Sequence, residues 1–243
     1  MIDIHLRKLR ARDDISAAEE AAIRAAVSGT RPVDADETFI HAGELLTAST
    51  ILLTGLMCRF KDMSNGGRQI TELHVPGDFV DLHSFTLKQL DHDVMTLTPA
   101  RLANVPHDNL RRITERFPHI TRMYWFSTNL DAVVHREWEL SLGRRTARAR
   151  LATLLSELHL RLRIVGLADA NGYDLSLTQT DLAECTGLTN VHVNRTLREL
   201  REEGLVALQA GRVTIIDRLS LWRVGEFDPR YLYLDPDRLG LFS

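Results

Sequence analysis

One short stretch of the chain concentrates side chains that can bond to nucleic-acid bases and phosphates. On a helix beginning at Thr189, Val193, Leu197 and Leu200 fall on one buried face. The opposite face at helical spacing consists of Asn190, Val191, Asn194, Arg195 and Arg198. The Arg195 guanidinium can donate two hydrogen bonds to guanine O6 and N7, and Asn194 can pair with adenine or bond a phosphate. The full candidate set is Thr178, Gln179, Thr189, Asn190, Val191, His192, Asn194, Arg195 and Arg198.

The remaining candidates have less specific chemistry. Backbone N–H groups and the dipole attract phosphate at a helix start, where Asn190 and His192 would lie. Thr178 and Gln179 begin the preceding helix and are expected to bond phosphates that set the docking angle. An isolated Arg195 would more simply form a surface ion pair with a glutamate four residues on, and only the surrounding motif favours the base contact.

The elements that must position these side chains follow from spacing. Ala183 is small where two helices nearly touch, and Gly187, four residues later, supplies a tight turn in which a positive φ costs glycine nothing. Thr178 and Asp181 have the spacing of a capping box. Two short apolar runs joined by a glycine turn follow at residues 205–216. The sequence therefore predicts a helix-turn-helix followed by a hairpin wing.

The N-terminal half has a different character. Residues 6–27 are rich in alanine and predict one or two short helices. From residue 33 to residue 105, short apolar runs alternate with turn residues, and the Asn65-Gly66 pair favours a hairpin turn. Many short strands at near-even spacing predict a small antiparallel β-roll.

After Phe117-Pro118 the pattern becomes helical, and a helix over residues 119–142 would be roughly 35 Å long. It carries two apolar stripes, which imply two partners. One stripe can cover the roll, and the other fits a second copy of the chain. The second stripe consists of Met123, Phe126, Leu130, Val133 and Leu140. The alternative is a single broad stripe buried within one chain. Gly143 is predicted to interrupt the helix as a hinge before another helix that runs to about residue 165.

Composition limits the class of protein. The chain has 243 residues and a formal net charge of −3, so contact with nucleic acid must be made by a local patch. Two cysteines far apart in sequence favour a reducing cytoplasm over a disulfide framework. Cys185 is expected to be a small buried residue, although a thiol near DNA could act as a redox switch. Neither a signal peptide nor a membrane-spanning run is expected.

The order of roll, long helix and winged helix-turn-helix resembles the Crp/Fnr family of bacterial transcription regulators. The resemblance rests on LTQTDLAECTGLTNVHVNRTLRELREEGL, NGGRQI and VPGDF. It implies an α+β fold with a sensor domain over residues 1–117, a dimerisation helix over 118–142 and a DNA-binding domain over 143–243. It also implies a homodimer on a near-palindromic DNA site, acting on RNA polymerase. Many relatives carry glutamate where this chain has Val191, so their common half-site is not expected here.

The sensor and its effector are less well defined. Candidate pocket residues are Gly77, Asp78, Phe79, His83, Lys88 and His92. Relatives that bind cyclic AMP use a glycine-glutamate pair and a later arginine, whereas this chain has no arginine between Arg68 and Arg101. Burying a cyclic phosphate without a guanidinium is costly, so the usual binding of cyclic AMP is disfavoured. A four-cysteine iron–sulfur cluster is nearly excluded, and haem stays open because several histidines lie nearby.

No catalytic motif and no tight spacing of metal ligands is present, so an enzyme and a metal site are not expected. The principal hypothesis is a homodimeric, sequence-specific DNA-binding transcription regulator without a predicted cofactor. The alternative is a regulatory module that binds a small, cyclic-nucleotide-like ligand and acts through protein contacts. The sequence leaves open the effector, the operator and the choice between activation and repression.

Overall fold

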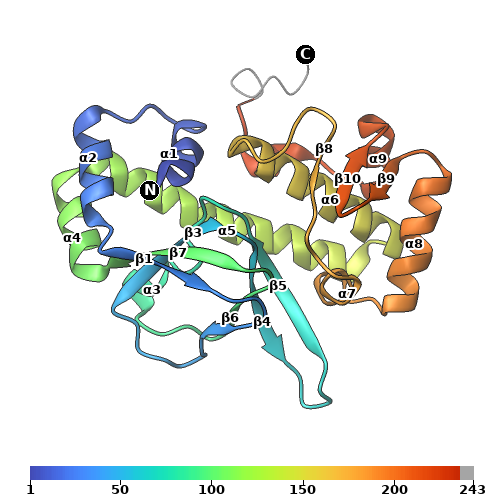
Figure 1. Cartoon of the computed structure of the whole chain (residues 1–243), viewed down its shortest axis with the longest axis horizontal. Coiled ribbons are helices and arrows are strands. Elements are labelled where there is room, and N and C mark those ends of the chain that lie inside the picture. The colour runs from blue at the N-terminus through green and yellow to red at the C-terminus, as the bar shows by residue number, and fades with distance from the viewer. Residues whose placement is uncertain (236–243) are drawn as a thin grey trace. The chain divides into compact units, whose positions relative to one another are not determined.

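The computed structural model describes residues 1–235 (Figure 1). Contacts divide the chain into two compact units. The first contains residues 1–61 and 73–132, and the second contains residues 62–72 and 133–234. The first is built around the strands of the roll, and the second around the helix-turn-helix. The predicted third region runs to Ser243, and its last residues, 236–243, lie outside the described part.

Two short helices open the first unit, as the alanine-rich start predicts. They are α1 (Asp3–Arg10) and α2 (Ala17–Ala26). Ser16 caps α2, since its hydroxyl accepts from the Glu19 amide while the Glu19 carboxylate accepts from the Ser16 amide. Leu6 and Ile23 bury the apolar faces of the two helices in the core.

The roll consists of two antiparallel sheets. Strands β1 (Gly29–Val33), β7 (Ala100–Pro106) and β3 (Ala48–Thr54) form one sheet in that order. Strands β2 (Thr38–Ile40), β6 (Asp93–Thr96), β4 (Met57–Asp62) and β5 (Arg68–His74) form the other. Leu52, Met57 and Leu102 fill a core between them. The predicted fold class, an α+β protein with an N-terminal antiparallel roll, is confirmed.

Three helices follow or interrupt the strands. They are α3 (Ser84–Leu87), α4 (His107–Arg116) and α5 (Pro118–Arg144). Pro118 occupies the first position of α5, where its missing N–H is not needed. A second core of the first unit joins α1, α2, α4 and the start of α5, with Leu110, Ile113 and Ile120 at its centre.

The second unit contains the remaining elements. They are α6 (Ala147–Ile164), β8 (Gly172–Asp174), α7 (Gln179–Thr186), α8 (Asn190–Glu202), β9 (Val206–Gln209), β10 (Arg212–Ile215), α9 (Arg218–Gly225) and the 3-10 turn η1 (Pro229–Leu232). Helix α6 is buried along most of its length and supports α7, α8 and α9. No helix in residues 1–235 is long and apolar enough to cross a membrane.

The structure corrects one predicted boundary. Gly143 does not interrupt the long helix, because α5 continues through it to Arg144. The break comes two residues later, where the Thr146 hydroxyl accepts from the Ala149 amide and starts α6. A single glycine in a helix costs only about 1 kcal/mol relative to alanine, and flanking turns offset that cost here.

Candidate nucleic-acid interface

The first helix of the helix-turn-helix begins and ends as its sequence requires. The Asp181 amide donates to the Thr178 hydroxyl over 3.1 Å, and the Thr178 amide donates to the Asp181 carboxylate over 2.6 Å. The helix ends at Gly187, whose φ of 63° lies in the left-handed region. A Cβ at Gly187 would lie 3.2 Å from the Leu142 side chain, so both the turn and the close packing favour glycine at this position.

The second helix, α8, separates its faces sharply. Thr189 caps it by accepting from the His192 amide over 3.3 Å. Val193, Leu197 and Leu200 are buried, and so is Thr196, which replaces the apolar residue usual there. All nine predicted DNA-contacting residues are exposed, and Val191 reaches 75% exposure. Packing therefore leaves the predicted reading face of α8 in solvent.

Two hydrogen bonds tie the reading face of α8 to the start of α7. Asn194 donates from its amide to the Gln179 side chain over 2.6 Å, and Asn190 donates to the Thr180 hydroxyl over 3.2 Å. These bonds fix side chains from two helices in one polar surface. Such preorganisation lowers the entropic cost of binding a partner there.

The arginines of α8 form only loose surface ion pairs. Arg195 lies 3.7 Å from Glu199, and Arg198 lies 3.9 Å from Glu202, each pair four residues apart on the helix. Exposed pairs of this kind contribute between about 0 and 1 kcal/mol. The ion pair considered as the alternative for Arg195 is thus present, and it is weak enough to be exchanged for a base.

The wing forms as the predicted hairpin. Strands β9 and β10 pair antiparallel around Ala210 and Gly211, both with positive φ, as a mirror-image hairpin turn requires. Strand β8 adds to β10 on the other side. A three-residue strand leaves little periodicity to detect, so no sequence pattern indicated β8.

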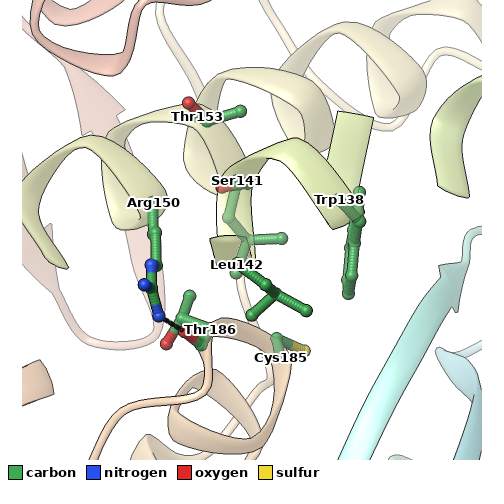
Figure 2. A pocket seen from close by; sticks show the side chains of 8 residues that line it. Trp138, Ser141, Leu142, Arg150, Thr153, Cys185 and Thr186 are labelled. Atoms are coloured by element: carbon green, nitrogen blue, oxygen red, sulfur yellow. Dashed lines mark hydrogen bonds between the residues drawn. The ribbon is translucent and has the colours of Figure 1, made fainter. Parts of the chain in front are cut away.

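Helix α6 holds the end of α7 (Figure 2). Arg150 donates from Nη1 to the Thr186 carbonyl over 3.0 Å, satisfying one of the open carbonyls at the helix end. Cys185 is buried beside a cavity of about 20 Å³ that Trp138 and Leu142 also line. Burial agrees with the prediction of a small packed residue, since a reactive thiol needs access to solvent.

Comparisons with known proteins place both units. Residues 30–117 match the family model of the cyclic nucleotide-binding domain, and residues 149–224 match the Crp-like helix-turn-helix domain. The chain belongs to the Crp/Fnr family. It is thus a Crp/Fnr-type DNA-binding transcription regulator, as the sequence predicted.

Several Crp/Fnr proteins resemble it along most of its length. The transcriptional activator FnrL of Cereibacter sphaeroides is 29% identical over 201 residues, 82% of this chain and 80% of FnrL. The anaerobic regulatory protein of Haemophilus influenzae is 25% identical over 77% of this chain and 72% of its own. The solved structure of FixK2 from Bradyrhizobium japonicum is 25% identical, with a TM-score of 0.73 over 81% of this chain and 96% of FixK2.

The sensor residues predicted from the sequence have different surroundings in the structure. The Asp78 carboxylate is buried, pairs with Lys8 of α1 and accepts from the Val75 amide over 3.1 Å. Phe79 packs edge-on against His5, with ring centroids 5.0 Å apart. Both side chains are engaged within their own unit, and Gly77 shapes the turn beside them with a φ of 96°. Their role in an effector pocket stays a prediction.

The other three predicted sensor residues have different neighbours. The rings of His83 and His92 lie 5.5 Å apart, and Lys88, the left-handed residue that ends α3, donates to the Phe85 carbonyl. No group of three His, Cys, Asp or Glu side chains in residues 1–235 is arranged to hold a metal ion. The absence of a predicted cofactor stays a prediction.

Sequence reasoning missed a buried arginine in the roll. Arg59 of β4 is 2% exposed and donates to the Val80 carbonyl and, over 3.2 Å, to Asp131 of α5. Nearby Asp81 is fully buried, and burial raises its pKa to about 7. Arginine is rarely buried without partners. No local pattern indicated Arg59, because its partners come from segments 21 and 72 residues away.

The predicted dimer stripe of α5 divides in the structure. Met123 is buried in the core of its own unit, so its assignment to an exposed seam is wrong. Phe126, Leu130 and Val133 are partly exposed, and Leu140 is 45% exposed. The largest exposed apolar side chain of α5 is Trp125, which the sequence reasoning left out. Its flanking residues do not repeat an apolar period.

Proposed function

We propose that this Crp/Fnr regulator is a homodimer that inserts α8 into the major groove of a near-palindromic site. The exposed, preorganised face of α8 carries the proposal. Arg195 reads a guanine, Asn194 bonds adenine or phosphate, and Thr178 and Gln179 bond the phosphates that fix the docking angle. Thr189, Asn190, Val191, His192 and Arg198 complete the DNA-contacting set.

The test of the reading face is equilibrium binding to a duplex recovered by genome-wide mapping. Arg195→Ala should lower the affinity for the preferred site about 5- to 150-fold, since one bidentate contact is worth ~1–3 kcal/mol. Arg101→Ala is the matched control, because Arg101 is an exposed arginine on β7 of the roll, outside the DNA-contacting set. Equal losses for the two variants would refute the reading role of Arg195.

Dimerisation is proposed to use the exposed side of α5. Its 27 residues exceed what the roll core covers, and Phe126, Leu130, Val133 and Leu140 leave apolar surface open. Leu140→Lys should yield monomers in sedimentation and weaken DNA binding, because a charge would enter an apolar seam. The neighbouring exposed Glu139→Lys is the control. A monomeric wild type would remove the seam altogether.

Action on RNA polymerase and a cytoplasmic location are proposed by family resemblance. The alternative, a ligand-binding module that acts through protein contacts, would need another role for the exposed face of α8. No effector is assigned, and the usual mode of cyclic AMP binding stays disfavoured. Arg59, the buried arginine of the roll, is already bonded to Val80 and Asp131, so it is not a free phosphate receptor.

A further inference from the structure

A cavity of about 430 Å³ lies in the first unit, between α3, α4 and the first half of α5. Small-molecule sites in proteins typically measure about 300–1,000 Å³. Within residues 1–235, His83 is the one member of the predicted effector set that lines this cavity. The space is therefore distinct from the segment around Gly77 that the sequence indicated.

The lining favours an uncharged occupant. Leu82, Phe85 and Leu110 supply its apolar wall, and Trp125 stands at its edge with 67% of its surface exposed. The described lining contains no Lys, Arg, Asp or Glu. Transferring an ion into such a place without an opposite charge is costly, so the fitting ligand is uncharged.

Four threonines give the cavity a defined hydrogen-bonding character. Each uses its hydroxyl proton within the chain, by donating to a backbone carbonyl. They are Thr86, Thr114, Thr121 and Thr128, bonded to the carbonyls of His83, Leu110, Thr114 and Trp125. A threonine oxygen that has donated its proton can still accept. The wall therefore favours a ligand with N–H or O–H donors.

Tyr124 adds a polar group without a protein partner at the cavity wall. Its side chain lines the cavity, is 6% exposed, and makes no hydrogen bond to any residue in the described part of the chain. Burial raises the pKa of its hydroxyl, so the phenol stays neutral. The Tyr124 ring packs in the core, but its hydroxyl is not among the buried unpaired atoms of the described residues, so it can bond a ligand that enters the cavity.

We propose that this cavity binds an uncharged, largely apolar molecule whose hydroxyl or amine group pairs with Tyr124 and the threonine oxygens. The proposal stands on the first unit alone and does not depend on DNA binding. A nucleotide fits it poorly, because the described lining holds no Lys or Arg for a phosphate.

The experiment uses a matched pair of fluorescent probes on the full chain. N-phenyl-1-naphthylamine is neutral, apolar and carries one N–H donor, and 1-anilinonaphthalene-8-sulfonate has the same ring system with an added negative charge. The neutral probe should bind saturably, once per chain. The sulfonate should bind at least about tenfold more weakly, since it finds no cation. Equal affinity for both probes, or no saturable binding of the neutral one, would overturn the proposal.

Two variants locate the probe. Thr128→Trp should fill the cavity and abolish binding. Asn129 is the next residue, is exposed and does not line the cavity, so Asn129→Trp should leave binding unchanged. Tyr124→Phe keeps the ring and should weaken binding about three- to tenfold through one lost hydrogen bond. Sedimentation of each variant gives its oligomeric state, which shows whether a second copy of the chain covers the cavity. In that case the neutral probe would not bind until the copies separate, and the proposal would fail.

Discussion

The helix-turn-helix and the roll contain similar polar side chains but place them in opposite environments. On α8, Asn194 and Arg195 are exposed, and their bonds to Gln179 and Glu199 are made with other surface side chains. In the roll, Arg59, Asp78 and Asp81 are buried and bonded to their own chain. Polar groups kept in water remain available to a partner, whereas buried ones are committed to the fold. Charges of α8 should therefore govern binding, and charges of the roll should govern stability.

The largest effect is expected at the buried arginine. Arg59→Met leaves the buried Val80 carbonyl and the Asp131 carboxylate, which is 25% exposed, without their guanidinium. An unbonded buried carbonyl and a partly solvated carboxylate together should cost about 2–4 kcal/mol. Urea unfolding of the full chain at pH 7 should show this loss in the free energy of unfolding. The exposed Arg101→Met on β7 should change stability by less than about 0.5 kcal/mol. Similar results for both would erase the contrast between interior and surface.

The next effect depends on pH and sets His5 against Asp81. Burial lowers the pKa of His5 from 6.5 to about 4 and raises that of Asp81 from 3.8 to about 7. As pH falls from 6.5 to 4, the unfolded state takes up a proton at His5 that the folded state refuses, so stability is lost. Over the same range the folded state holds a proton at Asp81, so stability is gained. The two slopes oppose each other.

Replacing His5 should expose the slope of Asp81. As the pH falls from 6.5 to about 4, His5→Phe is expected to gain ~1.4 kcal/mol of stability relative to the wild type for each pH unit. The measurement is the midpoint of urea unfolding at several pH values. Any change in packing caused by His5→Phe is the same at every pH, so it does not affect the slope of stability against pH. A wild-type-minus-variant difference independent of pH would show that His5 titrates normally, and that the roll does not enforce its protonation states.

A smaller effect on the fold, with a larger one on binding, is expected on the other side of the comparison. Arg195→Ala should lose affinity for the preferred base pair while its free energy of unfolding stays within about 0.5 kcal/mol of the wild type. Anisotropy with duplexes altered at single positions would locate the affected base. If Arg195→Ala changed the free energy of unfolding as much as that of DNA binding, Arg195 would contribute to the fold like the buried charges of the roll.

The smallest effect is expected at the helix cap that aligns α7. Thr178→Ala removes the hydroxyl that accepts from the Asp181 amide and should cost ~1 kcal/mol. Thr178→Ser keeps the cap and serves as the control. Thermal unfolding gives the comparison. DNA affinity that falls with Ala and recovers with Ser would show that the hydroxyl, rather than the methyl group, serves the reading surface.

The same contrast explains which features could be predicted from the sequence. The helix-turn-helix was predictable because its determinants are local. Gly187, the cap at Thr178 and the apolar spacing of α8 all act within a few residues. The roll strands were predictable as short alternating runs, and the fold class followed from them. The predicted domain boundaries and the role of each DNA-contacting residue stay predictions.

The missed features depend on distant contacts. Arg59 is buried only because Val80 and Asp131 reach it from other elements. Met123 was assigned to a dimer seam because helical spacing shows which residues share a face, but not which neighbour covers that face. Gly143 was predicted as a break because glycine has a low helix propensity, but the helical turns on both sides continue α5 through it to Arg144.

The most direct measurement is competition between a duplex recovered from the genome and its scrambled counterpart for the full chain at physiological salt. A reading face on α8 predicts a preference of about 10³-fold or more for the recovered duplex, as specific regulators show. Arg195→Ala should reduce this preference, and Arg101→Ala on β7 should not. Equal affinity of the wild type for the two duplexes would contradict the claim that the exposed face of α8 reads a DNA sequence.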